Sequence, residues 1–121
     1  MDKELRLALT IRLYSDDGRR CFGPGVATLL LRVREHKSLR AAAASMEMAY
    51  SKAWRIVRTA EEFFGCKLLS STIGGKHGGG AELTPAAQRL LSAYQDYTAQ
   101  VESFAREKFE ETMGFYQELE R

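Results

Sequence analysis

Hydrophobic and polar residues alternate strictly near the start of the chain, over residues 5–13. The apolar positions are Leu5, Leu7, Leu9, Ile11 and Leu13. A period of two residues is typical of a half-buried β-strand, because successive side chains point to opposite faces. Residues 15–18, Ser-Asp-Asp-Gly, have the composition of a turn, and residues 19–22 can return as a short second strand. The pattern therefore predicts a β-hairpin within residues 1–22.

A break at residues 23–25, Gly-Pro-Gly, is followed by apolar positions at helical spacing. The spacing predicts helices over about residues 26–37, 39–45 and 50–64. Ser38 is a suitable cap for the second helix, and the four alanines at 41–44 favour helix and let a neighbouring helix approach closely. Gly65 is suited to end the third. Residues 26–64 therefore predict one helix followed by a helix-turn-helix.

The third predicted helix divides into two faces at about 100° per residue. Its apolar face holds Ala53, Ile56, Val57, Ala60, Phe63 and Phe64. Its polar face holds Ser51, Lys52, Arg55, Arg58, Thr59 and Glu62. Trp54 lies at the border, and we expect Trp54 and Tyr50 to pack in the core or against another domain rather than to stack on bases.

A glycine-rich stretch with one lysine, residues 74–80, separates two strand-like segments, residues 67–73 and 81–83. Glycine permits a left-handed backbone and close approach to another surface. Residues 67–83 therefore predict a wing, a two-stranded sheet with a basic tip. A nucleotide-binding loop is disfavoured, because Lys76 is followed by His77 and not by Ser or Thr.

Thr84 and Pro85 form a strong helix start, and the last helix is predicted over residues 85–120. Its apolar stripe could cover its own domain, but at about 1.5 Å per residue so long a helix extends past a small domain. A symmetric dimer would bury the overhang. We expect the dimer interface to contain Leu30, Tyr94, Tyr97, Val101 and Phe104.

The charge is unevenly divided along a chain of net charge +2. Residues 19–58 hold nine Lys or Arg against two Glu, whereas residues 59–121 hold six basic and ten acidic residues. A positive region over the helix-turn-helix favours a polyanionic partner, although a solvated basic surface has the same composition. The length of 121 residues fits one domain, and we expect it to be cytoplasmic because neither a signal peptide nor a membrane-spanning run is present.

The residue types indicate binding and not catalysis. Cys21, Cys66, His36 and His77 have neither metal-site nor triad spacing, so we expect no metal, no cofactor and no enzyme activity. In a recognition helix, basic and hydroxyl side chains near the N-terminus reach base edges. We therefore expect Ser51, Lys52 and Arg55 to read bases. The expected backbone contacts are Arg40, Arg58, Thr59, Lys76 and His77.

Two motifs carry a family resemblance: Tyr50-Ser51-Lys52-Ala53-Trp54, and Gly74 to Ala81 followed by Leu83-Thr84 and Gln88-Arg89-Leu90. Over about Leu29–Leu91 the chain resembles the N-terminal DNA-binding domain of ModE-type molybdate-responsive transcription regulators and, more distantly, LysR-type winged helices. The resemblance implies dimerisation through the first and last helices and binding to a palindromic operator. Ser71 and Ala49 depart from the family pattern, so the operator sequence does not carry over.

These observations predict a single domain that is mainly α with small β, a winged helix-turn-helix with an N-terminal β-hairpin and a long C-terminal dimerisation helix. The leading hypothesis is a homodimeric transcription regulator that binds double-stranded DNA. Since family members that sense molybdate carry further β-barrel domains, we expect a stand-alone DNA-binding domain. The alternative is a protein-interaction adaptor that keeps the winged fold without DNA binding.

Overall fold

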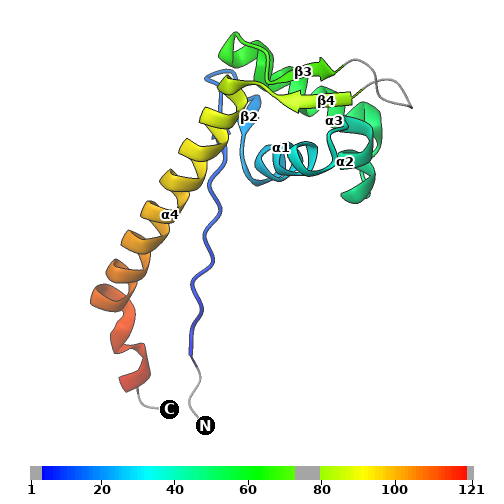
Figure 1. Ribbon diagram of the computed structural model, residues 1–121. Helices are drawn as coiled ribbons and strands as arrows, with labels where there is room; N and C mark the ends of the chain where they lie inside the picture. Colours follow the sequence, from blue (N-terminus) through cyan, green and yellow to red (C-terminus); the bar gives the residue numbers. More distant parts are fainter. Residues whose placement is uncertain (1–3, 73–79, 120–121) are drawn as a thin grey trace.

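The computed structural model describes residues 4–72 and 80–119. Its elements are β1 (Leu13–Tyr14), β2 (Arg20–Phe22), α1 (Pro24–His36), α2 (Leu39–Ser45), α3 (Tyr50–Phe64), β3 (Leu69–Thr72), β4 (Gly80–Leu83), α4 (Pro85–Met113) and a 3₁₀ turn, Gly114–Glu118. Figure 1 shows a head made by α1 to α3 and both sheets, and α4 leaving it as a long stalk. The predicted winged helix-turn-helix with its N-terminal hairpin is confirmed.

The core of the head forms around α1. Leu29, Leu30 and Val33 of this helix are fully buried, and α2 and α3 cover them with small side chains. Those small residues are Ala42, Ala43, Ala53 and Ala60. Alanine lets helix backbones approach closely, so the alanine run of α2 serves the packing that its sequence predicts.

Leu30 corrects one expectation. It was placed at the dimer interface, but its side chain has no exposed surface and packs among core residues of its own chain. The expectation was wrong because the apolar side of α1 packs against core residues of the same chain inside the head. A second copy of the chain cannot reach this side chain without opening the core.

The turn between α2 and α3 depends on one residue in the left-handed region. Glu47 has φ 53°, and the Met48 N–H donates to the Ala43 carbonyl at 2.9 Å. Ala49 then precedes α3 without a side-chain cap. The tight turn sets the start of α3 against the end of α2, which is the geometry of a helix-turn-helix.

The wing strands pair antiparallel, with Leu69 opposite Leu83 and Thr72 opposite Gly80. The Ala81 N–H donates to the Lys37 carbonyl at 2.9 Å, so the wing is tied to the C-terminal end of α1. A Cβ at Gly80 would collide with the Thr72 hydroxyl, which favours glycine at the first residue of β4. The tip, residues 73–79, lies outside the described residues.

The N-terminal segment differs from the predicted strand. Only Leu13–Tyr14 pairs with Arg20–Phe22, around a turn in which Gly18 has φ 90°. Residues 4–12 are extended, pair with no strand in the part of the chain that the structure describes, and run beside α4 (Figure 1). The Tyr94 hydroxyl donates to the Ile11 carbonyl at 2.6 Å, and burial raises the pKa of this phenol. The hydrophobic–polar alternation correctly predicted an extended backbone. A β-strand also needs hydrogen bonds to a neighbouring strand, and the neighbour of this segment is the helix α4.

The stalk helix is buried only where it leaves the head. Ala87 and Leu91 are its buried residues, whereas Tyr97 and Phe104 further along are 51% and 59% exposed. The helix was predicted to reach residue 120, but α4 ends at Met113 and a 3₁₀ turn begins at Gly114. Of the helices in residues 4–72 and 80–119, none is long and apolar enough to cross a bilayer.

Thr84 joins the wing to α4. Its Oγ1 accepts a hydrogen bond from the Ala87 N–H at 3.1 Å and donates one to the Lys67 carbonyl at 2.7 Å. Thr84→Ala removes both bonds, and we expect the free energy of unfolding, measured by chemical denaturation, to fall by about 1–2 kcal/mol. Thr84→Ser keeps the hydroxyl and should therefore retain most of the free energy of unfolding.

Thr112→Ala is the matched control, because the Thr112 hydroxyl only donates back to the Lys108 carbonyl at 2.7 Å on the exposed part of α4. Thr112→Ala should change the free energy of unfolding by no more than about 0.5 kcal/mol. Equal losses for the two alanine variants would contradict the role of Thr84 as a cap.

Candidate nucleic-acid interface

The side of α3 that faces away from the core is basic and exposed. Ala53, Val57 and Ala60 are buried on the inner side. Ser51, Lys52, Arg55 and Arg58 are exposed, and Thr59 is half-buried. The described residues therefore leave the side chains of the predicted recognition face open to a ligand.

A hollow of about 590 Å³ lies between α3 and the wing. Arg40, Tyr50, Trp54, Arg58 and Lys67 line it, together with wing residues that include Ser71 and Gly80. The guanidinium carbon of Arg40 lies 4.2 Å from the Tyr50 ring centroid, and that of Arg58 lies 5.4 Å from the Trp54 ring. Such cation–π pairs hold arginines in place while their N–H groups remain available.

Tyr50 and Trp54 correct a second expectation. They were expected to pack in the core or against another domain. Packing in the core is wrong, because the two side chains are 40% and 47% exposed and line the hollow beside the wing. The physical reason is their angle on the helix, which points them to the flank that the wing leaves open. The sequence held a signal for this, because Arg58 follows Trp54 by four residues, the spacing of neighbours on a helix surface.

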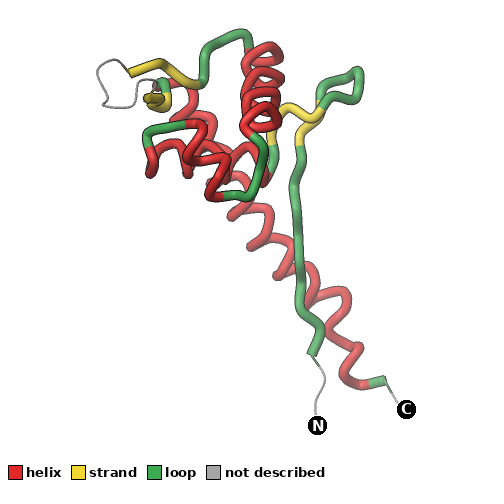
Figure 2. The backbone as a smooth tube through the Cα atoms, turned by 90° about the vertical axis from the view of Figure 1, so that its right-hand side faces the viewer, coloured by secondary structure: helices red, strands yellow, loops and turns green. Residues whose placement is uncertain are grey.

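Thr59 and the other flank of α3 face the β1–β2 hairpin. Lys52, Arg55 and Thr59 line a second hollow there, of about 630 Å³. Figure 2 shows α3 between the wing strands on one side and the hairpin on the other. The recognition face is therefore the ridge between two concave surfaces.

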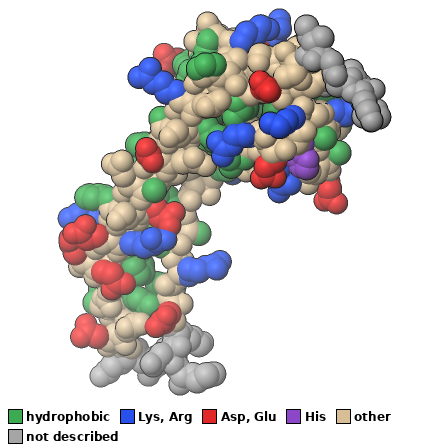
Figure 3. Space-filling model, in the orientation of Figure 1, with side chains coloured by type: hydrophobic (Ala, Val, Ile, Leu, Met, Phe, Trp, Pro, Cys, Tyr) green, Lys and Arg blue, Asp and Glu red, His purple; other side chains and the backbone are tan. Residues whose placement is uncertain are grey.

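Few carboxylates neutralise this surface. Arg58 and Arg19 both lie 3.4 Å from Glu62, and these side chains are about half exposed. Arg40, Lys52 and Arg55 have no carboxylate within 4 Å among the described residues. Exposed ion pairs of this kind are weak, so a phosphate can replace Glu62 at little cost. Figure 3 shows mainly acidic side chains along the stalk, whereas basic and acidic side chains are mixed over the face of the head in view.

The remaining predicted residues are dispersed. Lys76 and His77 lie outside the described residues. Tyr94 is half-buried, and it packs on Phe22 with ring centroids 5.1 Å apart, so it serves its own chain. Tyr97, Val101 and Phe104 lie on the stalk, away from the two hollows.

Comparisons with known proteins agree with this geometry. The model of the family described as bacterial regulatory helix-turn-helix protein, lysR family, matches residues 27–88, from α1 to the first turn of α4. The transcriptional regulator ModE of Haemophilus influenzae is 32% identical over 92 residues, 76% of this chain and 35% of that protein. The resemblance to ModE-type and LysR-type DNA-binding domains is thereby confirmed.

Two further relatives match shorter stretches. The molybdenum-pterin-binding protein MopB of Rhodobacter capsulatus is 36% identical over 66 residues, 54% of this chain and 24% of that protein. The molybdenum transport protein ModE of Herbaspirillum seropedicae is 34% identical over 68 residues, 56% of this chain and 25% of that protein. The matched stretches therefore span a quarter to about a third of the length of these relatives.

The exposure of Trp54 has a measurable consequence for stability. Trp54→Ala removes a side chain that is 47% exposed, and we expect the free energy of unfolding to fall by less than about 1 kcal/mol. Leu68→Ala, at a side chain with no exposed surface, should cost about 2–5 kcal/mol. Chemical denaturation of both variants checks this. A larger loss of stability for Trp54→Ala would indicate that the Trp54 side chain is buried, and would contradict its position in the exposed hollow.

Proposed function

Because the chain belongs to the bacterial regulatory helix-turn-helix proteins of the lysR family, we propose that it is a transcription regulator that binds double-stranded DNA through α3. The observation that carries the proposal is the exposed basic side of α3, with Ser51, Lys52 and Arg55 pointing away from the core. An α-helix fits the major groove of B-DNA, where such side chains bond base edges.

The base-reading residues lie near the start of α3. Ser51, Lys52 and Arg55 fall in its first two turns, and a recognition helix contacts base edges mainly with such N-terminal residues. Arg55 can bond guanine through two N–H groups at once, which makes it the main specificity residue of the proposal. Ser51 and Lys52 add a shorter hydroxyl contact and a flexible charge.

The backbone contacts come from the hollow beside the wing. Arg40 and Arg58 present guanidinium groups that rest on Tyr50 and Trp54, so they meet a phosphate with little loss of side-chain freedom. Thr59 supplies a hydroxyl on the far side of the ridge. The sequence adds Lys76 and His77 at the wing tip as contacts to phosphates or the minor groove.

The stalk supports a homodimer. Tyr97, Val101 and Phe104 follow one side of α4, and Leu5 and Leu9 of the neighbouring N-terminal segment are also exposed. A second copy that covers this apolar surface would relate two α3 helices by a two-fold axis, which fits a palindromic operator.

The base contact predicts a sequence-dependent loss. Arg55→Ala should weaken binding to the preferred duplex, selected from a random pool, by about 1–3 kcal/mol, and should reduce discrimination at one base pair. Lys76→Ala should weaken all duplexes alike. Trp54 is the only tryptophan and lines the hollow beside the wing, so its fluorescence provides the titration signal.

Arg89→Ala is the control, because Arg89 is exposed on α4 and lies away from both hollows. It should bind like the parent. A parent chain that leaves every duplex unbound at low salt would refute the proposal and favour the adaptor, whose partner binding should not depend on salt. Unchanged discrimination in Arg55→Ala would remove Arg55 from the base contacts.

The dimer predicts a defined effect of charge on the stalk. Phe104→Glu places a carboxylate in the apolar surface, and we expect the dimer dissociation constant, measured by analytical ultracentrifugation, to rise by about a hundredfold. Gln95→Glu adds the same charge on the opposite side of α4 and should leave the dimer intact. Equal behaviour of the two variants would place the interface elsewhere.

A further inference from the structure

We propose that the β1–β2 hairpin is a second DNA-contacting element, which binds the phosphodiester backbone on the side of α3 opposite the wing. Arg12 and Arg20 are the residues that make this contact. The inference rests on the proposed function, because it requires that α3 lie in the major groove. It goes beyond that function by adding an element outside the helix-turn-helix and the wing.

The hollow on the hairpin side of α3 is lined by cations from two separate parts of the chain. Arg12, Arg19 and Arg20 come from the hairpin region, and Lys52 and Arg55 come from α3. All five side chains are exposed, and the residues that line the hollow include no carboxylate. Five like charges around one concavity repel one another, so an anion that enters it is favoured.

The ion pairs single out two of the arginines. Arg19 lies 3.6 Å from Asp17 and 3.4 Å from Glu62, so its charge is shared. Arg12 and Arg20 have no carboxylate within 4 Å in residues 4–72 and 80–119. Arg20 Nη2 instead lies 3.4 Å from the Tyr14 hydroxyl, which orients the guanidinium at the rim of the hollow. These two arginines can bind phosphate without breaking an ion pair.

The dimensions of the major groove connect the two hollows. The groove is about 12 Å wide, and an α-helix with its side chains is about 10–12 Å across. A helix that fills the groove therefore turns its two flanks toward the two backbones that border it. The hollow beside the wing meets one backbone. The hollow beside the hairpin meets the other, and duplex DNA satisfies both at once.

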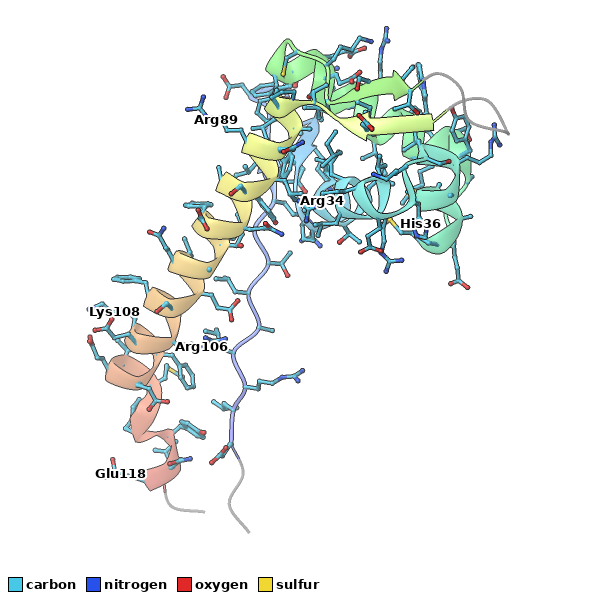
Figure 4. All side chains as sticks on the ribbon, viewed as in Figure 1. Arg34, His36, Arg89, Arg106, Lys108 and Glu118 are labelled. Carbon is cyan, nitrogen blue, oxygen red and sulfur yellow. The ribbon has the colours of Figure 1, made fainter. Side chains whose placement is uncertain are left out.

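The test compares two variants with the same loss of charge. Arg12→Gln/Arg20→Gln removes the proposed contacts, and Arg89→Gln/Arg106→Gln removes two cations of α4 that line neither hollow. Figure 4 shows Arg106 far along the stalk and Arg89 near the end of α4 that adjoins the head. On the preferred duplex at about 0.1 M salt, we expect the hairpin variant to bind about tenfold more weakly. Its plot of log affinity against log salt concentration should be less steep by about 2 per subunit. The ranking of duplex sequences should stay unchanged.

Hydroxyl-radical footprinting locates the contact. The hairpin variant should lose protection of the backbone on one border of the major groove and keep it on the other. Arg12→Lys/Arg20→Lys should restore most of the affinity, since a phosphate contact needs the charge and not the arginine fork. Poor rescue together with a changed sequence ranking would mean that the arginines read bases, and would overturn the proposal.

The outcomes separate this inference from the proposed function. If the hairpin variant binds and protects DNA as the stalk control does, while Arg55→Ala still loses discrimination, the hairpin proposal fails and the role of α3 stands. If the parent chain binds no duplex, both fail. Equal weakening of the hairpin variant and the stalk control would trace the effect to net charge, which also overturns the hairpin contact.

Discussion

Close packing of small side chains around α1 is the constraint on which the rest of the head depends. Ala42, Ala53 and Ala60 have no exposed surface, and their size lets α2 and α3 lie directly on α1. This packing uses only one side of α3, so its other side is left to solvent. The polar side chains there contribute little to stability, and they are therefore free to serve recognition.

The two ends of α1 hold the elements that flank α3. β2 leads into the N-terminal end through Gly23, and the wing is bound to the C-terminal end by the hydrogen bond from Ala81 to Lys37. A single 13-residue helix thus sets the distance between hairpin and wing. Because both flanking elements are tied to one rigid helix, the two hollows keep their places relative to the ridge between them, and binding needs little rearrangement of the head.

The stalk obeys a different constraint. Beyond Tyr94, which packs on Phe22, no described residue of α4 packs against the core. The extended N-terminal segment lies beside the helix and is held by hydrogen bonds between Tyr94 and Ile11 and between Leu5 and Tyr116. These two hydrogen bonds hold the segment beside α4, but the segment does not cover Tyr97 and Phe104, which remain exposed. A large apolar surface on an isolated helix favours association, which links the shape of the stalk to the proposed dimer.

The sequence by itself determined the elements with strong local signals. Helical periodicity placed α1 to α4, Gly65 and Thr84 marked their junctions, and the polar side of α3 identified the exposed residues, because these features depend on neighbours along the chain. Tertiary structure alone decided the fate of Leu30, Trp54 and residues 4–12. Periodicity says that a side chain is apolar or a backbone extended, but not what lies opposite it. Leu30 is buried in the core, Trp54 is exposed in the hollow beside the wing, and residues 4–12 lie beside α4 instead of a strand. Each outcome was set by residues that are distant in sequence.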